Sequence, residues 1–151
     1  MHDVMLPTFA EITDNFELLD EPEEQFQYLI ELGRQLPPLA AEAHTDDRLV
    51  QGCESRVWLD MSSSGRGDGA VIHIAADSDA HITKGLIAFL VALFSGQTAG
   101  KILATDAVAI FGDLGLGRHV TSKRSSGLRS MVERIRKEAR DLVGSPPAPA
   151  S

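Results

Sequence analysis

Cysteine is almost absent from the sequence, and its scarcity limits the functions that the chain can perform. Cys53 is the single cysteine among 151 residues, so no internal disulfide can form and nothing indicates an oxidising compartment. One thiol also cannot supply the several thiolates that an iron–sulfur cluster or a structural zinc ion takes from one chain. We therefore expect this chain to hold no metal and no cluster of its own.

Long hydrophobic runs are missing as well. The longest strongly apolar run covers the nine residues from Leu86 to Phe94, which is too short to span a bilayer. His2 and Asp3 do not form the basic start of a secretory signal, and no apolar stretch follows them. These absences predict a cytoplasmic protein with no membrane segment.

Positive charge is in deficit and unevenly distributed. The formal net charge of −8 at pH 7 argues against general affinity for nucleic acids. Residues 1–47 contain twelve acidic side chains and one basic one, whereas residues 123–140 contain seven of the fourteen Lys and Arg residues. This segregation is typical of solvated helix faces. The alternatives are that the acidic N-terminal helices lie beside the basic last helix, or that one segment binds a charged partner.

Two helices are expected before the cysteine. Thr8 and Glu11 form a capping box that predicts the start of the first helix. Asp20 is predicted to cap the second, which ends at Pro37-Pro38 because proline disfavours a helical conformation in the preceding residue. The positions expected to face the core are Phe9, Ile12, Phe16 and Leu19 in the first helix and Phe26, Leu29, Ile30 and Leu36 in the second.

A hairpin is expected after the cysteine. Strands are predicted at residues 56–61 and 70–75, joined by a turn at 62–69 that is rich in serine and glycine. This turn lacks the Lys-Ser/Thr ending of a phosphate-binding loop and joins two strands instead of opening a helix. It is therefore interpreted as a plain hairpin loop.

The remaining segments are predicted to be helical. Ser78 or Asp79 is expected to cap a helix whose body, residues 85–94, is apolar nearly all round, so it should lie buried at the centre. Two short helices are expected at 98–103 and 107–114. A last amphipathic helix should begin near Thr121 or Ser122. Its apolar face is predicted to comprise Leu128, Met131, Val132, Ile135, Ala139 and Leu142.

These elements predict an α+β fold. A small antiparallel sheet, a hairpin plus an edge strand, would be packed by the N-terminal and C-terminal helices around the buried central helix. Residues 1–143 are expected to form one domain, since the length suffices for a single core. Residues 144–151 contain three prolines and are predicted to be a disordered tail.

Cys53 is the first candidate for chemistry. It follows Gly52 and leads into the predicted strand that contains Trp58, so its thiol would be presented on a turn at the edge of a sheet. This position suits a nucleophile. The alternative is a small buried hydrophobic residue, because thiol reactivity depends on pKa and access that the sequence does not reveal.

Other titratable residues form weaker patterns. Asp77 and Asp79 precede a predicted helix, where carboxylates act as caps and dipole partners more often than as an acid–base pair. His44 is interpreted as a surface loop histidine. His73 and His81 form no recognisable ligand pattern with Cys53, because a metal site needs three or four convergent ligands.

The segment Gln-Gly-Cys-Glu-Ser-Arg-Val-Trp-Leu, residues 51–59, resembles the active-cysteine segment of the SufE family of sulfur acceptor proteins. Three further segments resemble that family in the same order. Residues 28–37 match its second helix, residues 77–88 the start of its central helix, and residues 119–128 the lead into its last helix. The similarity extends from about residue 9 to 142, and it implies a SufE/NifU-like fold.

The resemblance also implies a function. A pyridoxal-phosphate-dependent cysteine desulfurase would form a persulfide, Cys53 would accept its sulfane sulfur, and an iron–sulfur scaffold complex would receive it. The acceptor would stimulate the desulfurase. The pyridoxal phosphate would belong to the desulfurase, so this chain would need no cofactor. A paralogous branch of the family serves a second desulfurase, and the sequence leaves both partners open.

Arg124 and His119 match a family segment that lies near the active loop. The resemblance therefore implies a positive environment that lowers the pKa of Cys53. From the residues alone, Arg124 is equally compatible with a surface arginine in the first turn of a helix. His119 is compatible with a hydrogen-bonded loop histidine.

Three other functions are alternatives to sulfur acceptance. A scaffold for cluster assembly would need several cysteines, which the single thiol nearly excludes. A cysteine hydrolase would pair Cys53 with His119 or His44. A binding module could regulate a desulfurase allosterically without carrying sulfur.

Overall fold

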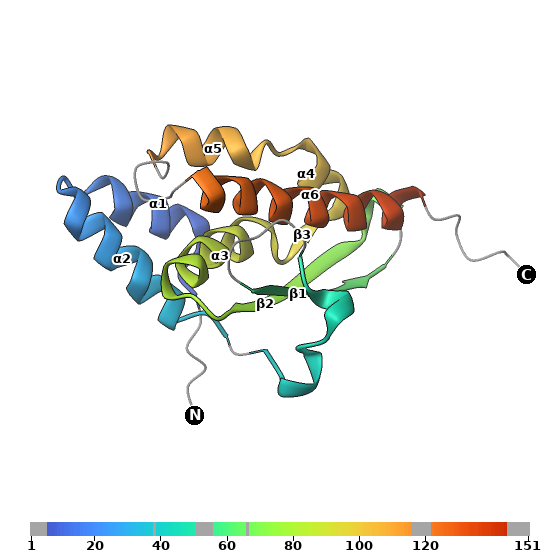
Figure 1. Ribbon diagram of the computed structural model, residues 1–151. Helices are drawn as coiled ribbons and strands as arrows, with labels where there is room; N and C mark the ends of the chain where they lie inside the picture. The colour runs from blue at the N-terminus through green and yellow to red at the C-terminus, as the bar shows by residue number, and fades with distance from the viewer. Residues whose placement is uncertain (1–5, 38, 51–55, 66, 116–121, 145–151) are drawn as a thin grey trace, which may run out of the picture.

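A sheet and a buried central helix organise the structure, which is a computed structural model (Figure 1). It describes residues 6–37, 39–50, 56–65, 67–115 and 122–144, with the backbone alone at Asp68, 122–126 and 142–144. Within these residues, three strands form an antiparallel sheet in the order β1-β2-β3. The helices pack on and around this sheet, which confirms the predicted α+β fold.

The hairpin is longer than the sequence predicted. Strands β1 (Val57–Ser64) and β2 (Val71–Ser78) pair along their whole length, from Val57 opposite Ser78 to Ser64 opposite Val71. The three serines at the end of β1 therefore belong to the strand and not to the turn. Strand β3 (Gln97–Thr98) pairs with the start of β2. An edge strand was expected, but the sequence did not place it here and assigned Thr98 to a helix.

Helix α3 (His81–Phe94) is the centre of the core, as predicted. It contacts α2 (Pro22–Arg34) on one side and β2 on the other, so apolar side chains are needed nearly all round. Phe89 is fully buried and makes edge-to-face contacts with the rings of Phe9, Phe16 and Phe111. These contacts connect α1 (Phe9–Glu17) and α5 (Ala107–Asp113) to the central helix.

The N-terminal helices differ from the prediction in two details. The capping box of Thr8 and Glu11 is confirmed, but the N-cap of α2 is Glu21 and not Asp20. Pro22 occupies the first turn of α2 and restrains Glu21 to an extended conformation, which places the helix boundary there.

The buried face of α2 is also rotated relative to the prediction. Phe26 is 37% exposed, whereas Gln25 is 5% exposed and donates a hydrogen bond to the carbonyl of Leu19 at 2.9 Å. Leu29 and Leu36 are buried as expected. Gln25 is buried because its amide satisfies a carbonyl in the connection between α1 and α2.

The predicted caps of α3 are wrong. Its N-cap is Ala80, which provides no side-chain hydrogen bond. Ser78 instead accepts a hydrogen bond from the backbone N–H of Ala80, and Asp79 accepts one from the N–H of Arg56 across the sheet. The Asp79 carboxylate is therefore committed to a tertiary contact.

The C-terminal half follows the predicted order. Thr98 caps α4 (Ala99–Ala104), Asp106 caps α5, and α6 extends over Ser122–Gly144. In Figure 1, α6 runs alongside α4 and α5 and over the central helix. The described part of its predicted apolar face is buried and comprises Leu128, Met131, Val132, Ile135 and Ala139. No helix in the described ranges combines the length and apolarity that crossing a membrane requires.

Candidate functional site

The structure describes the surroundings of the predicted site residues. Cys53 and His119 lie outside the described residues. Arg124 lies in the first turn of α6, where the backbone alone is described. The described part of the site consists of the segments that lead into and out of residues 51–55.

Val50 and Arg56, which flank residues 51–55, are both held by hydrogen bonds to the hairpin. The N–H of Val50 donates to the carbonyl of Val57 at 2.9 Å, and both residues belong to the hydrophobic core. On the other side, the N–H of Arg56 donates to the Asp79 carboxylate at 3.1 Å, and the N–H of Asp79 donates to the carbonyl of Arg56 at 3.3 Å. The segment that contains Cys53 thus begins and ends at points that hydrogen bonds hold in place.

Residues 39–50 lead into this segment and are called the cysteine arm. The arm contains two short 3₁₀ turns, Ala41–Ala43 and Asp46–Arg48, and ends with a bridge between Leu49 and Trp58. The sequence predicted a loop at His44. Backbone pairing with β1 fixes the end of the arm, at Leu49 and Val50, and side-chain contacts help to hold the less regular residues before it.

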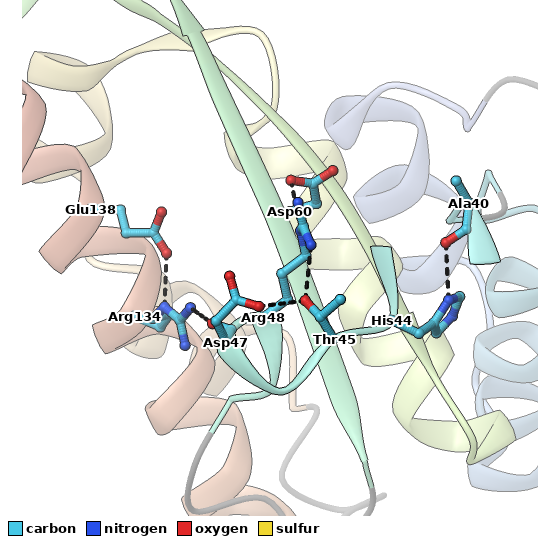
Figure 2. A network of polar contacts seen from close by, with 8 residues as sticks. All are labelled: Ala40, His44, Thr45, Asp47, Arg48, Asp60, Arg134 and Glu138. Atoms are coloured by element: carbon cyan, nitrogen blue, oxygen red, sulfur yellow. Dashed lines mark hydrogen bonds and ion pairs between the residues drawn. The ribbon is translucent and has the colours of Figure 1, made fainter. Parts of the chain in front are cut away.

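One contact joins the arm to strand β1 (Figure 2). Arg48 donates through Nε to Asp60 at 3.2 Å and through Nη1 to the hydroxyl of Thr45 at 2.8 Å. The Thr45 hydroxyl donates in turn to Asp47, and this hydrogen bond is the main reason that the pKa of Asp47 is lowered. Strand and arm are thereby linked through a short polar network.

A second contact joins the arm to α6 (Figure 2). The guanidinium of Arg134 donates to the carbonyl of Asp47 at 2.7 Å. It also donates to the carbonyl of Leu49 at 3.2 Å. Its Nε donates to Glu138 at 2.7 Å, one turn along the same helix. The last helix and the cysteine arm are therefore directly connected.

His44 makes the third contact: it lies in a loop and is partly exposed, as predicted, but its ring is engaged in tertiary contacts. Its Nδ1 lies 3.0 Å from the carbonyl of Ala40, and its Nε2 lies 2.8 Å from Oδ2 of Asp77. The ring packs edge-on against Trp58, with centroids 4.6 Å apart. Both ring nitrogens face acceptors, which favours the doubly protonated ring and leaves neither free to take a proton from a thiol.

The His44–Asp77 pair shifts both pKa values. The hydrogen bond to Asp77 raises the pKa of His44, although desolvation opposes this effect. Burial acts to raise the pKa of Asp77, but the hydrogen bonds from His44 and from the N–H of Ser78, together with Lys84, outweigh it and the pKa is lowered. Asp77 therefore acts as an ion-pair partner, and not as the helix cap that the sequence suggested.

An open groove of about 390 Å³ lies between the arm and α6. Its lining is mixed in charge and comprises Val50, Ser130, Glu133, Arg134, Lys137 and Arg140. Among the residues that the structure describes, no three His, Cys, Asp or Glu side chains converge to form a metal site.

The sequence did not reveal the residues that hold the arm. Arg48, Asp60 and Arg134 are contributed by three separate elements, and their roles depend on contacts between distant segments. The single available signal was the place of Arg134 between Met131 and Ile135, at the border of the apolar face of α6. That position predicts a partly buried Arg134 side chain, but it does not predict which groups the side chain contacts.

Comparison with known proteins identifies relatives for nearly the whole chain. The model for the family described as "SufE: Fe-S metabolism associated domain" matches residues 10–139. An uncharacterized SufE-like protein of Rhizobium etli is 44% identical over 137 residues, which cover 91% of this chain and 93% of that protein. An uncharacterized SufE-like protein of Rhizobium meliloti is 44% identical over 134 residues, covering 89% and 96%.

A solved structure has the same fold. The solution structure of a hypothetical protein from Thermus thermophilus superposes with a TM-score of 0.72 and covers 93% of this chain and 99% of that one. At 18% identity, this likeness is informative about the fold alone. The sequence matches go further: the chain belongs to the SufE family, and its domain is associated with iron–sulfur metabolism.

Proposed function

We propose that the chain accepts sulfane sulfur on Cys53 from a cysteine desulfurase and delivers it to an iron–sulfur scaffold complex. The observation that carries the proposal is the family match over residues 10–139, in which Cys53 is the one available thiol. The desulfurase would hold the pyridoxal phosphate, and this chain would hold no cofactor. The proposed site of action is the cytoplasm.

The transfer needs one thiolate and a donor persulfide. The Sγ of Cys53 loses its proton and attacks the outer sulfur of the persulfide on the desulfurase. A new S–S bond forms on Cys53 while the donor S–S bond breaks, and the donor cysteine leaves as a thiolate that is reprotonated. The sulfane sulfur changes carrier with no net oxidation, so no external oxidant or reductant is required.

The described residues support a carrier through the rigid base of the cysteine segment. Val50 and Val57 are buried and hydrogen-bonded to one another, so the chain on either side of residues 51–55 is attached to the core. A fixed base favours reproducible presentation of a thiol to a partner protein. We further propose that Arg124 and His119 supply positive charge that favours the thiolate of Cys53.

The experiment is intact-mass spectrometry after incubation with a cysteine desulfurase and cysteine. The wild-type chain should gain the mass of one sulfur atom, and Cys53→Ser should gain none. In a separate urea denaturation, Cys53→Ser should unfold at the same urea concentration as the wild type. Arg124→Ala and His119→Ala should slow the gain without changing its final extent, because they act on the fraction of thiolate.

Two results would contradict the proposal. Full stimulation of the desulfurase by Cys53→Ser would favour an allosteric module that carries no sulfur. A wild-type chain that gains no sulfur but acylates on an ester substrate would favour a hydrolase.

A further inference from the structure

Arg134 connects parts of the chain that are far apart in sequence. Its guanidinium contacts the carbonyls of Leu49 and Asp47, which lie 85 and 87 residues before it. The two bonds use different terminal nitrogens, so the planar fork holds two carbonyls at once. The third guanidinium nitrogen, Nε, donates to the carboxylate of Glu138. This ion pair balances the positive charge of Arg134 and orients its guanidinium.

The helix that carries Arg134 is firmly anchored. Ile135, the next residue, is fully buried, and so is Ala139 one turn later. Arg134 itself is half-buried, with 27% of its side chain exposed. Because apolar packing holds α6 in place, the guanidinium is a fixed point against which the arm can be located.

The arm depends on such external points. The backbone hydrogen bonds of its second turn are local, from Arg48 to Thr45 and from Leu49 to Asp46. Arg48 attaches this turn to β1 through Asp60, and Arg134 attaches it to α6. The carbonyl of Leu49 directly precedes Val50, and Cys53 follows three residues later.

We propose that Arg134 is a positioning residue for sulfur acceptance: it holds the cysteine arm against α6 and thereby sets the place from which Cys53 is presented. This role rests on the function proposed above. Arg134 acts through the carbonyls of Asp47 and Leu49, and it needs no contact with the sulfur that is transferred.

Arginine suits this role better than its usual substitutes. Lysine offers one compact ammonium and can satisfy one carbonyl well, whereas glutamine is shorter and uncharged. Arg134→Lys should therefore retain part of the effect and Arg134→Gln should lose it. The chain also offers a matched control on the same helix, since Arg136 donates to the carbonyls of Leu103 and Thr105 at 3.1 and 3.3 Å, away from the arm.

The test combines two measurements on the full chain. The first is amide hydrogen exchange at Val50, whose N–H is bonded to Val57. The second is the rate of persulfide formation on Cys53 at a fixed desulfurase concentration and increasing concentrations of this chain, which gives kcat and KM for the chain as sulfur acceptor. For Arg134→Gln we expect exchange at Val50 to be about tenfold faster and kcat for sulfur acceptance to be about tenfold lower, with KM unchanged. Arg134→Lys should fall between this variant and the wild type.

The control separates a local role from general weakening of α6. Arg136→Gln should change neither Val50 exchange nor kcat, and equal effects from the two substitutions would overturn the proposal. Wild-type exchange at Val50 in Arg134→Gln would overturn it as well, whatever the sulfur assay shows. A rise in KM with constant kcat would also overturn it, because that result assigns Arg134 to partner binding. A wild-type chain that accepts no sulfur would instead refute the proposed function.

Discussion

The contact between α2 and α3 and the contact around the cysteine arm are held together in opposite ways. Between the helices, glycines allow the backbones to approach: a Cβ added at Gly85 would lie 2.2 Å from the carbonyl oxygen of Leu29. Around the arm, long polar side chains connect segments whose backbones lie further apart: Arg134 connects α6 to the arm, and His44 connects the arm to β2. One region excludes any added atom, and the other is spanned by charged groups that solvent partly reaches.

This difference separates stability from positioning. The helix contact lies in the apolar core, where a change in volume is felt directly by the fold. The arm enters the core at Val50, but its polar contacts to β1, β2 and α6 are half-exposed, and each contributes modestly to stability. Substitutions in the arm should therefore change the presentation of the cysteine segment while the fold persists.

The largest effect is expected from Gly85→Ala. In an exposed helix this change is favourable by about 1 kcal/mol, but here the new methyl group would collide with the backbone of α2. We expect a loss of about 3 kcal/mol in the free energy of unfolding, measured by urea denaturation. Gly112→Ala in α5 is the matched control, because a Cβ there meets no atom within 4 Å, and it should be neutral or stabilising. Equal effects at both sites would contradict the close-packing interpretation.

A smaller, pH-dependent effect is expected from the pair of His44 and Asp77. Folding raises the pKa of His44 above its ordinary value of 6.5, so its contribution to stability is complete below that pH and is lost as the pH rises through the folded-state pKa. Folding lowers the pKa of Asp77 below 3.8, so its contribution is lost only in stronger acid. The ion pair should therefore stabilise the arm most between pH 3.8 and pH 6.5, the ordinary pKa values of the two side chains.

The measurement is a double-mutant cycle of His44→Gln and Asp77→Asn, followed by urea denaturation on both sides of the His44 titration. The coupling between the two residues should be fully present at about pH 5.5, below the ordinary pKa of histidine, and should weaken as the pH rises through the folded-state pKa of His44. In an NMR titration, Asp77→Asn should lower the pKa of His44. A titration curve that does not change in the variant would show that the pair does not control His44.

The smallest effect is expected from Lys137→Gln. Lys137 pairs with Asp141 on α6, three residues after Arg134, but both partners are about two-thirds exposed. Solvent screening reduces the value of such a pair to under about 0.5 kcal/mol. Urea denaturation should therefore give nearly the wild-type midpoint. A loss comparable to that of Gly85→Ala would mean that exposed pairs contribute to this fold as strongly as the core does.

Local patterns predicted most of the elements. The capping box at Thr8 and the all-round apolar run of α3 depend on neighbours a few residues away, and both were interpreted correctly. The errors at Phe26 and Asp79 have a different origin. Gln25 replaces Phe26 in the interior because it satisfies a carbonyl of the preceding connection, and Asp79 serves the N–H of Arg56, 23 residues away.

The sequence by itself determined the α+β class, the central place of α3 and the presence of a single thiol, because these follow from composition and from the periodicity of apolar residues. The tertiary structure alone decided what holds the cysteine arm. Arg134, Asp60 and Asp77 reach it from three elements that are distant in sequence, and hydrogen bonds of this kind depend on distances that only the packed chain sets.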